Sequence, residues 1–90
     1  MSNNALMWEV RVAEGRLAEV ISWIEGNVVP FLGHQHGCRS VDVYRSAEDR
    51  AVVIAHFDGE PVALPEPPNE LVARPVHQWP FEHVRSHGIS

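Results

Sequence analysis

Two charged side chains interrupt the first apolar stretch of the chain. Glu9 and Arg11 alternate with Trp8, Val10 and Val12, and alternate residues of a strand point to opposite faces of a sheet. If the apolar set packs on a helix, Glu9 and Arg11 lie on the other face. There they could serve as an acid/base and as the group that orients a substrate oxygen. The alternative is a structural ion pair between strands or between two chains.

Three further side chains could take part in the same chemistry. His56 ends an apolar run and could act as the general base for a phenol or quinol, or be a structural residue at a strand end. Tyr44, which shares a strand face with Asp42, is a candidate substrate-binding donor, or packs without a chemical role. Trp79, in the last apolar segment, is a second candidate substrate-binding residue.

A loop with the pattern His34-Gln-His36-Gly-Cys38 could hold copper or zinc. No fourth ligand or carboxylate lies nearby in the sequence, so we predict that no metal is required. The motifs G-x-G-x-x-G and G-x-x-x-x-G-K are absent, and no serine has the setting of a nucleophile elbow. We therefore predict no cofactor and no hydrolase chemistry.

The first half of the chain predicts the elements that position these residues. A strand is expected over Ala5 to Val12, followed by a helix from Arg16 that ends by Gly33. The helix is predicted from a stripe of apolar residues at helical spacing: Leu17, Val20, Ile21, Ile24, Val28 and Phe31.

A hairpin is predicted next, with strand two over Ser40 to Arg45 and a polar turn at Ser46 to Asp49. We expect Arg50 to lie in this exposed turn. The run Val52 to Ala55 shows no alternation, which predicts a strand buried on both faces. One helix covers one face only, so a second copy of the chain is expected on the other.

The last third of the chain is interrupted by prolines. Five of the seven prolines lie between Pro61 and Pro75, so only a single turn, at Asn69 to Ala73 and capped by Asn69, is expected there. A last strand is predicted over Val76 to Arg85. Pro80 cannot donate to a ladder and places this strand at a sheet edge.

This order of elements predicts an α+β fold: a ferredoxin-like antiparallel sheet with one long helix and a shortened second crossover. The 90 residues form a single domain (1–90), and the net charge of −5 argues against nucleic acid and anionic membranes as partners. No apolar run is long enough to span a bilayer. A single cysteine and a start without a basic region predict a cytoplasmic protein.

Several of these segments resemble the antibiotic biosynthesis monooxygenase family. The resemblance rests on Trp8 to Val12, Gly15 to Val20, Asn27 to Phe31, Gly37-Cys38 with Val41 to Ser46, and Val52 to Ala55. It implies a dimeric α+β barrel in which two sheets enclose a small-molecule cavity. The family's second helix is shortened in this chain, which departs from the usual roof of that cavity.

The resemblance implies a small-molecule enzyme, with cofactor-independent oxygenation of an aromatic or polyketide-like substrate as the expected reaction. The predicted partners are a flat, mostly apolar ligand and a second copy of the chain. Two alternatives stay open: a barrel that binds haem or another small ligand, and a dimeric interaction protein without catalysis.

Overall fold

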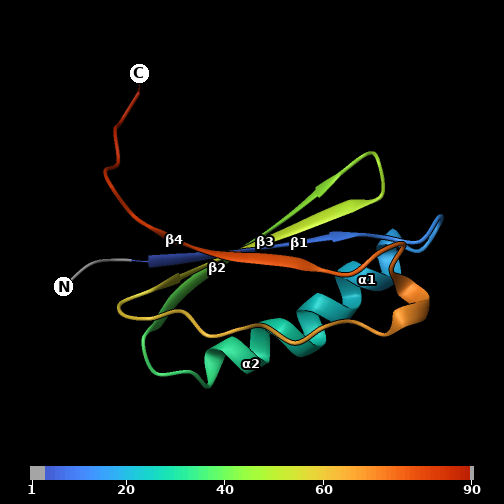
Figure 1. Ribbon diagram of the computed structural model, residues 1–90, viewed down its shortest axis with the longest axis horizontal. Helices are drawn as coiled ribbons and strands as arrows, with labels where there is room; N and C mark the ends of the chain where they lie inside the picture. The colour runs from blue at the N-terminus through green and yellow to red at the C-terminus, as the bar shows by residue number, and fades with distance from the viewer. Residues whose placement is uncertain (1–3, 90) are drawn as a thin grey trace.

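A four-stranded antiparallel sheet carries a helix on one of its faces (Figure 1). The computed structural model describes residues 4–89. The strands are β1 (Asn4–Arg11), β2 (Cys38–Ser46), β3 (Arg50–Phe57) and β4 (His77–Glu82). Their order in the sheet is β2-β3-β1-β4, the ferredoxin-like arrangement predicted from the sequence.

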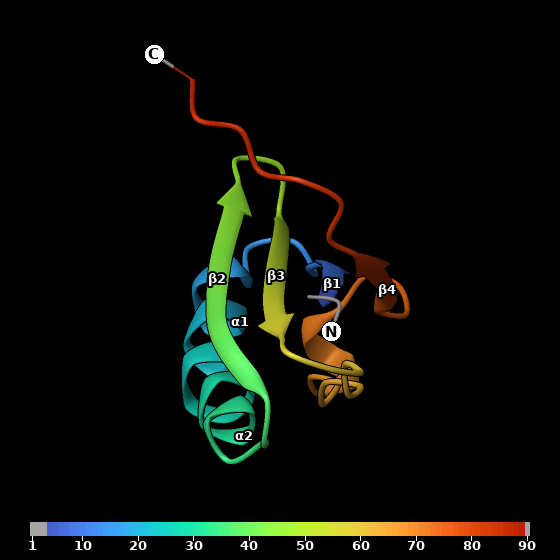
Figure 2. The same ribbon diagram turned by 90° about the vertical axis from the view of Figure 1, so that its left-hand side faces the viewer.

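The core lies between the sheet and the helix. Trp8 and Val10 of β1 and Val53 of β3 are fully buried, as are Val20 and Ile24 of the helix. The burial of β1 alternates from Ala5 to Arg11, so the predicted assignment of its two faces is confirmed for the helix side. Figure 2 shows the twist of the sheet: β2 and β3 run vertically while β1 and β4 are seen nearly end-on.

The long helix is continuous but contains one wide turn. It consists of α1 (Leu17–Trp23), a π-helical turn (Ile24–Val28) and α2 (Val29–Gly33). Its buried residues repeat every four positions: Val20, Ile24, Val28 and Leu32. At 3.6 residues per turn such a repeat drifts around a regular α-helix by about 40° per step. In the π turn the Val29 N–H donates to the Ile24 carbonyl, so this turn contains one residue more than an α-helical turn. The extra residue compensates for the drift, and the buried residues on both sides of the turn face the sheet.

The crossover from β3 to β4 is mostly irregular and runs along the same side of the sheet as the helix (Figure 1). It contains one 3-10 turn, Asn69–Leu71, and it buries Leu64 and Leu71 against the core. The predicted single turn is therefore present but shorter. The predicted cap was wrong: Pro68 occupies the cap position, and no side chain caps the turn. Proline at that position fits because its missing N–H would have no partner there.

The hairpin between β2 and β3 is longer than predicted, and one residue changes its place. Arg50 was expected in the exposed turn, but it is the first residue of β3 and pairs with Arg11 of β1. Asp49, with φ of 54°, ends the turn in the left-handed region, which allows the ladder to begin at the next residue. At the other end of the sheet β4 stops at Glu82 rather than Arg85, and it is an edge strand as Pro80 predicted.

Candidate ligand-binding site

The face of the sheet opposite the helix holds all five residues that the sequence singled out for catalysis or substrate binding: Glu9, Arg11, His56, Tyr44 and Trp79. In β1 and β3 alternation places these side chains there because their strand neighbours are buried under the helix. The pairing of β2 and β4 with these strands puts Tyr44 and Trp79 on the same face. The strand pairing arranges the face in rows that cross the sheet, with one residue from each strand in a row. In the order β2, β3, β1, β4 the rows are Tyr44, Val52, Glu9, His77; Asp42, Ile54, Met7, Trp79; and Ser40, His56, Ala5, Phe81. A further row at the hairpin end contains Ser46, Arg50 and Arg11.

The middle of this face is apolar. Val52, Ile54 and Met7 are half-buried at its centre. Three large aromatic side chains flank them on the outer strands and stay exposed in the single chain: Tyr44 at 55%, Trp79 at 45% and Phe81 at 51%. Flat aromatic walls around an aliphatic floor suit the binding of a flat apolar body. Both predicted substrate-binding residues, Tyr44 and Trp79, belong to this surface.

One end of the face carries a cluster of charges. The Glu9 Oε2 lies 3.9 Å from the Arg50 Nε, which is ion-pair distance but too long for a hydrogen bond. The Nε atoms of Arg11 and Arg50 are both buried and have no hydrogen-bond partner among the described residues. Arg11 and Arg50 are also directly paired across the two central strands. This end of the face therefore holds two guanidinium groups and one carboxylate, and the carboxylate lies at ion-pair distance from Arg50.

The opposite end of the face carries two histidines. His56 Nε2 lies 3.4 Å from Asp42 Oδ2, so the carboxylate can hold the ring and leave Nδ1 facing away from it. The chain after β4 passes close by, where His83 Nε2 is 2.8 Å from Ser86 Oγ. Together they border a hollow of about 330 Å³, lined by Asn4, Arg39, Ser40, His56, His83 and Ser86.

The three predicted catalytic residues share the face but do not form one cluster. Glu9 pairs with Val52, whereas His56 lies four residues further along β3. At 3.3 Å rise per residue, this places the two side chains about 13 Å apart along the strand direction. Within one chain, Glu9 and Arg11 can act on the same end of a ligand, and His56 lies at the other end of the face.

The loop with the metal-like pattern is not gathered into a site. His34 Nδ1 lies 2.7 Å from the Pro30 carbonyl oxygen at the end of the helix, so this nitrogen already has a hydrogen-bond partner four residues earlier in the chain. Cys38 is already part of β2, and partial burial raises the pKa of its thiol. Among residues 4–89, no group of three or more histidine, cysteine or carboxylate side chains could hold a metal ion.

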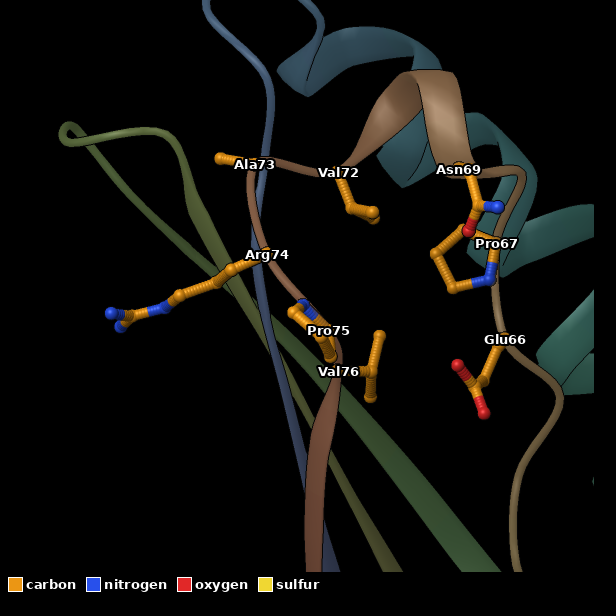
Figure 3. Close-up of a pocket in the computed structure, with 8 residues that line it drawn as sticks. All are labelled: Glu66, Pro67, Asn69, Val72, Ala73, Arg74, Pro75 and Val76. Carbon is orange, nitrogen blue, oxygen red and sulfur yellow. The ribbon is translucent and has the colours of Figure 1, made fainter.

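A second hollow of about 330 Å³ lies away from this face, between the proline-rich crossover and the start of β4 (Figure 3). Val72, Pro75 and Val76 form one wall, and Pro67 and Glu66 form the other. Figure 3 shows that Arg74 points away from it. Its lining offers one carboxylate and one amide, from Glu66 and Asn69, and none of the residues that the chemistry of the sheet face requires.

Two members of the site were missed at the level of sequence. Arg50 was assigned to the turn, although the even spacing between Arg50, Val52, Ile54 and His56 would have placed it on their face once that face was known. Asp42 was noted only as a neighbour of Tyr44. Its contact with His56 depends on the register of β2 on β3, which includes an irregularity between Cys38 and Ser40.

No protein-family model and no curated protein matches the sequence. Solved structures do match over almost the whole chain. Rv0793 from Mycobacterium tuberculosis is 18% identical with a TM-score of 0.71, over 97% of this chain and 100% of that one. The protein NE2512 from Nitrosomonas europaea is 12% identical with a TM-score of 0.73, over 100% and 97%. A candidate antibiotic biosynthesis monooxygenase from Bordetella bronchiseptica is 16% identical with a TM-score of 0.72, over 94% and 100%.

These likenesses confirm the predicted resemblance at the level of the fold. The chain has the ferredoxin-like α+β fold of structures described as candidate antibiotic biosynthesis monooxygenases. Over residues 4–89 the structure contains no helix long and apolar enough to cross a membrane.

Proposed function

We propose that two copies of this chain place their helix-free sheet faces together and bind a flat, mostly apolar small molecule between them. We further propose that the bound molecule, aromatic or polyketide-like, is oxygenated by dioxygen without a cofactor. The observation that carries the proposal is the layout of the face itself. An apolar floor lies between aromatic walls, and it has an acid beside two cations at one end.

The exposed aromatic side chains support the proposal that another molecule covers this face. Tyr44, Trp79 and Phe81 together present a large apolar surface that a stable soluble chain normally covers. The half-buried floor of Val52 and Ile54 continues that surface toward the centre. A second chain packed on this face would remove it from water, and in this proposal the ligand lies between the two sheets.

The proposed reaction needs only groups of the charged end. The Glu9 carboxylate removes a proton from a CH2 group of the substrate that is acidified by a ring carbonyl. Arg11 donates hydrogen bonds to the enolate oxygen that results. The carbanion carbon then gives its electrons to dioxygen and forms a C–O bond. The peroxide loses water to leave a new C=O, so one oxygen atom enters the product and the other leaves as water with the two hydrogens of the CH2.

Anthrone is a suitable probe because it is flat, tricyclic and carries such a CH2 group. We expect the protein to accelerate its conversion to anthraquinone, with one atom of labelled dioxygen in the product. Glu9→Gln should reduce the rate by about 10²-fold or more, the usual contribution of a general base. Arg45→Gln is the matched control, because Arg45 is exposed on β2 outside the rows of the face.

The same experiment distinguishes oxygenation from the other functions that the sequence leaves open. If His56→Gln loses the rate enhancement and Glu9→Gln keeps it, the general base is His56 and not Glu9. An absence of turnover in a protein that still binds the probe would contradict the enzymatic proposal and favour a binding protein. A haem-binding barrel would instead show the intense Soret absorption of haem after incubation with it.

A further inference from the structure

We infer that the ligand of the sheet face carries a negative charge of its own, which Arg11 and Arg50 recognise together. This inference rests on the proposed function, because it assigns the chemical class of the molecule bound at that site: an aromatic acid or another flat molecule with an anionic group at one end.

The arrangement of the two arginines is the first observation behind it. The Cβ atoms of residues directly opposite in an antiparallel pair lie about 5 Å apart, and like charges at such positions are destabilising. Arg11 and Arg50 occupy such a pair on the two central strands, at the hairpin end of the sheet. The overall charge of the chain is −5, so this concentration of positive charge is local and opposes the general balance.

The state of their donors is the second observation. Both Nε atoms are buried and have no hydrogen-bond partner among residues 4–89. Glu9, at 3.9 Å from Arg50 Nε, balances one of the two charges but does not satisfy either donor. Buried N–H donors are normally paired, and a carboxylate or sulfonate matches the fork geometry of a guanidinium group. An anionic group of the ligand would supply the second negative charge and the missing acceptors.

The third observation is what lies next to the pair. Val52 follows Arg50 by two residues on the same face, with Tyr44 beside it on β2 and Glu9 on β1. Ile54, Met7 and Trp79 lie in the next row, with Asp42 at its β2 edge. An anionic group held by the arginines therefore has an apolar surface directly beside it, on which an aromatic body can lie.

Two fluorescent probes with the same apolar body test the inference. 8-Anilinonaphthalene-1-sulfonate carries an anionic group, and N-phenyl-1-naphthylamine lacks it. We expect the wild-type protein to bind the sulfonate more tightly. Arg11→Gln and Arg50→Gln should each weaken sulfonate binding about tenfold, since a hydrogen-bonded charge pair is lost, and should leave binding of the neutral probe unchanged.

Further variants distinguish recognition of charge from a loss of structure. Arg50→Lys, which keeps the charge, should recover part of the sulfonate affinity, and Arg45→Gln, which removes one charge elsewhere, should have no effect. Each variant is checked for an unchanged thermal unfolding midpoint.

The inference is overturned if both probes bind equally well, or if the arginine variants change the binding of both probes by the same factor. If neither probe binds the wild-type protein, the proposed ligand-binding face is refuted, and the inference is refuted with it. Binding of the neutral probe alone would overturn the inference and leave the proposed function standing.

Discussion

The first turn of the long helix is held by a pair of exposed side chains. Arg16 donates from Nε to Glu19 Oε1 at 2.6 Å and from Nη2 to Glu19 Oε2 at 2.9 Å. Arg16 also occupies the cap position, where no side chain accepts from the free N–H groups of the helix. A carboxylate in the first turn is favourable there because the amino end of a helix carries a partial positive charge. The hydrogen bonds from Arg16 lower the pKa of Glu19.

Replacing this glutamate should therefore change stability in a pH-dependent way. A lowered pKa in the folded state means that the carboxylate stabilises the fold above the ordinary pKa of glutamate. This contribution is lost as the pH falls through the lowered value. We expect Glu19→Gln to reduce the free energy of unfolding slightly at neutral pH and to have no effect in acid.

Urea unfolding at neutral and acidic pH checks this expectation. Glu25→Gln serves as the control, because Glu25 is an exposed acid of the same helix with no ion pair among residues 4–89. A loss of stability in Glu19→Gln that stays the same at both pH values would contradict an ionic origin.

At the scale of the elements, the proline-rich crossover depends on one side chain of β4. Gln78 Oε1 accepts the Leu64 N–H at 3.0 Å, and Gln78 Nε2 donates to the Leu64 carbonyl at 3.5 Å. The side-chain amide thus pairs both backbone groups of Leu64, a residue of the crossover that is not part of a strand. Leu64 itself is buried, so these backbone groups would otherwise lack partners away from water.

We expect Gln78→Ala to destabilise the protein by about 1–3 kcal/mol, the cost of leaving buried polar groups unpaired. The amide of Leu64 should also lose its protection from hydrogen exchange, while the amides of β1 and β3 keep theirs. Glu82→Ala, at an exposed position of the same strand, should change neither quantity. Unchanged protection at Leu64 in Gln78→Ala would show that the crossover is held by other contacts.

The elements also show which parts of the fold and site follow from local sequence. In β1, apolar and charged residues alternate from Trp8 to Arg11, so the two faces could be assigned before the structure was known. In β3 the run Val52 to Ala55 is apolar throughout and does not show which residues share a face, so the orientation of His56 stayed open and Arg50 was assigned to the turn. Both depend on the register of β3 against β1, a long-range property.

For the whole molecule, the main consequence of the fold is an uncovered sheet face. The helix and the crossover both lie on one side (Figure 1), and among residues 4–89 no element packs on the other. A chain of 90 residues buries a modest share of its surface, so association would add substantially to its stability.

We expect the protein to sediment as a dimer at micromolar concentration. Ile54→Arg should shift it to a monomer, because the substitution places a charge in the apolar centre of the helix-free face. Val84→Arg, in the exposed segment after β4, should leave the dimer intact. A wild-type protein that sediments as a folded monomer would contradict the paired-sheet arrangement.

The π turn in the helix has a consequence for how this chain is aligned with others. A π turn is equivalent to one residue inserted into an α-helix. Removing Gly26 would change the buried positions from spacings of four, four and four to four, three and four, the repeat of a regular α-helix. The shorter helix would also bring the ring of Pro30 against a carbonyl one turn earlier, so Pro30→Ala belongs with such a deletion.

A homologue with an uninterrupted helix therefore aligns with this chain only through a one-residue gap between Ile24 and Val28. Without that gap, each residue from Val28 to Leu32 is matched to a neighbour on a different side of the helix.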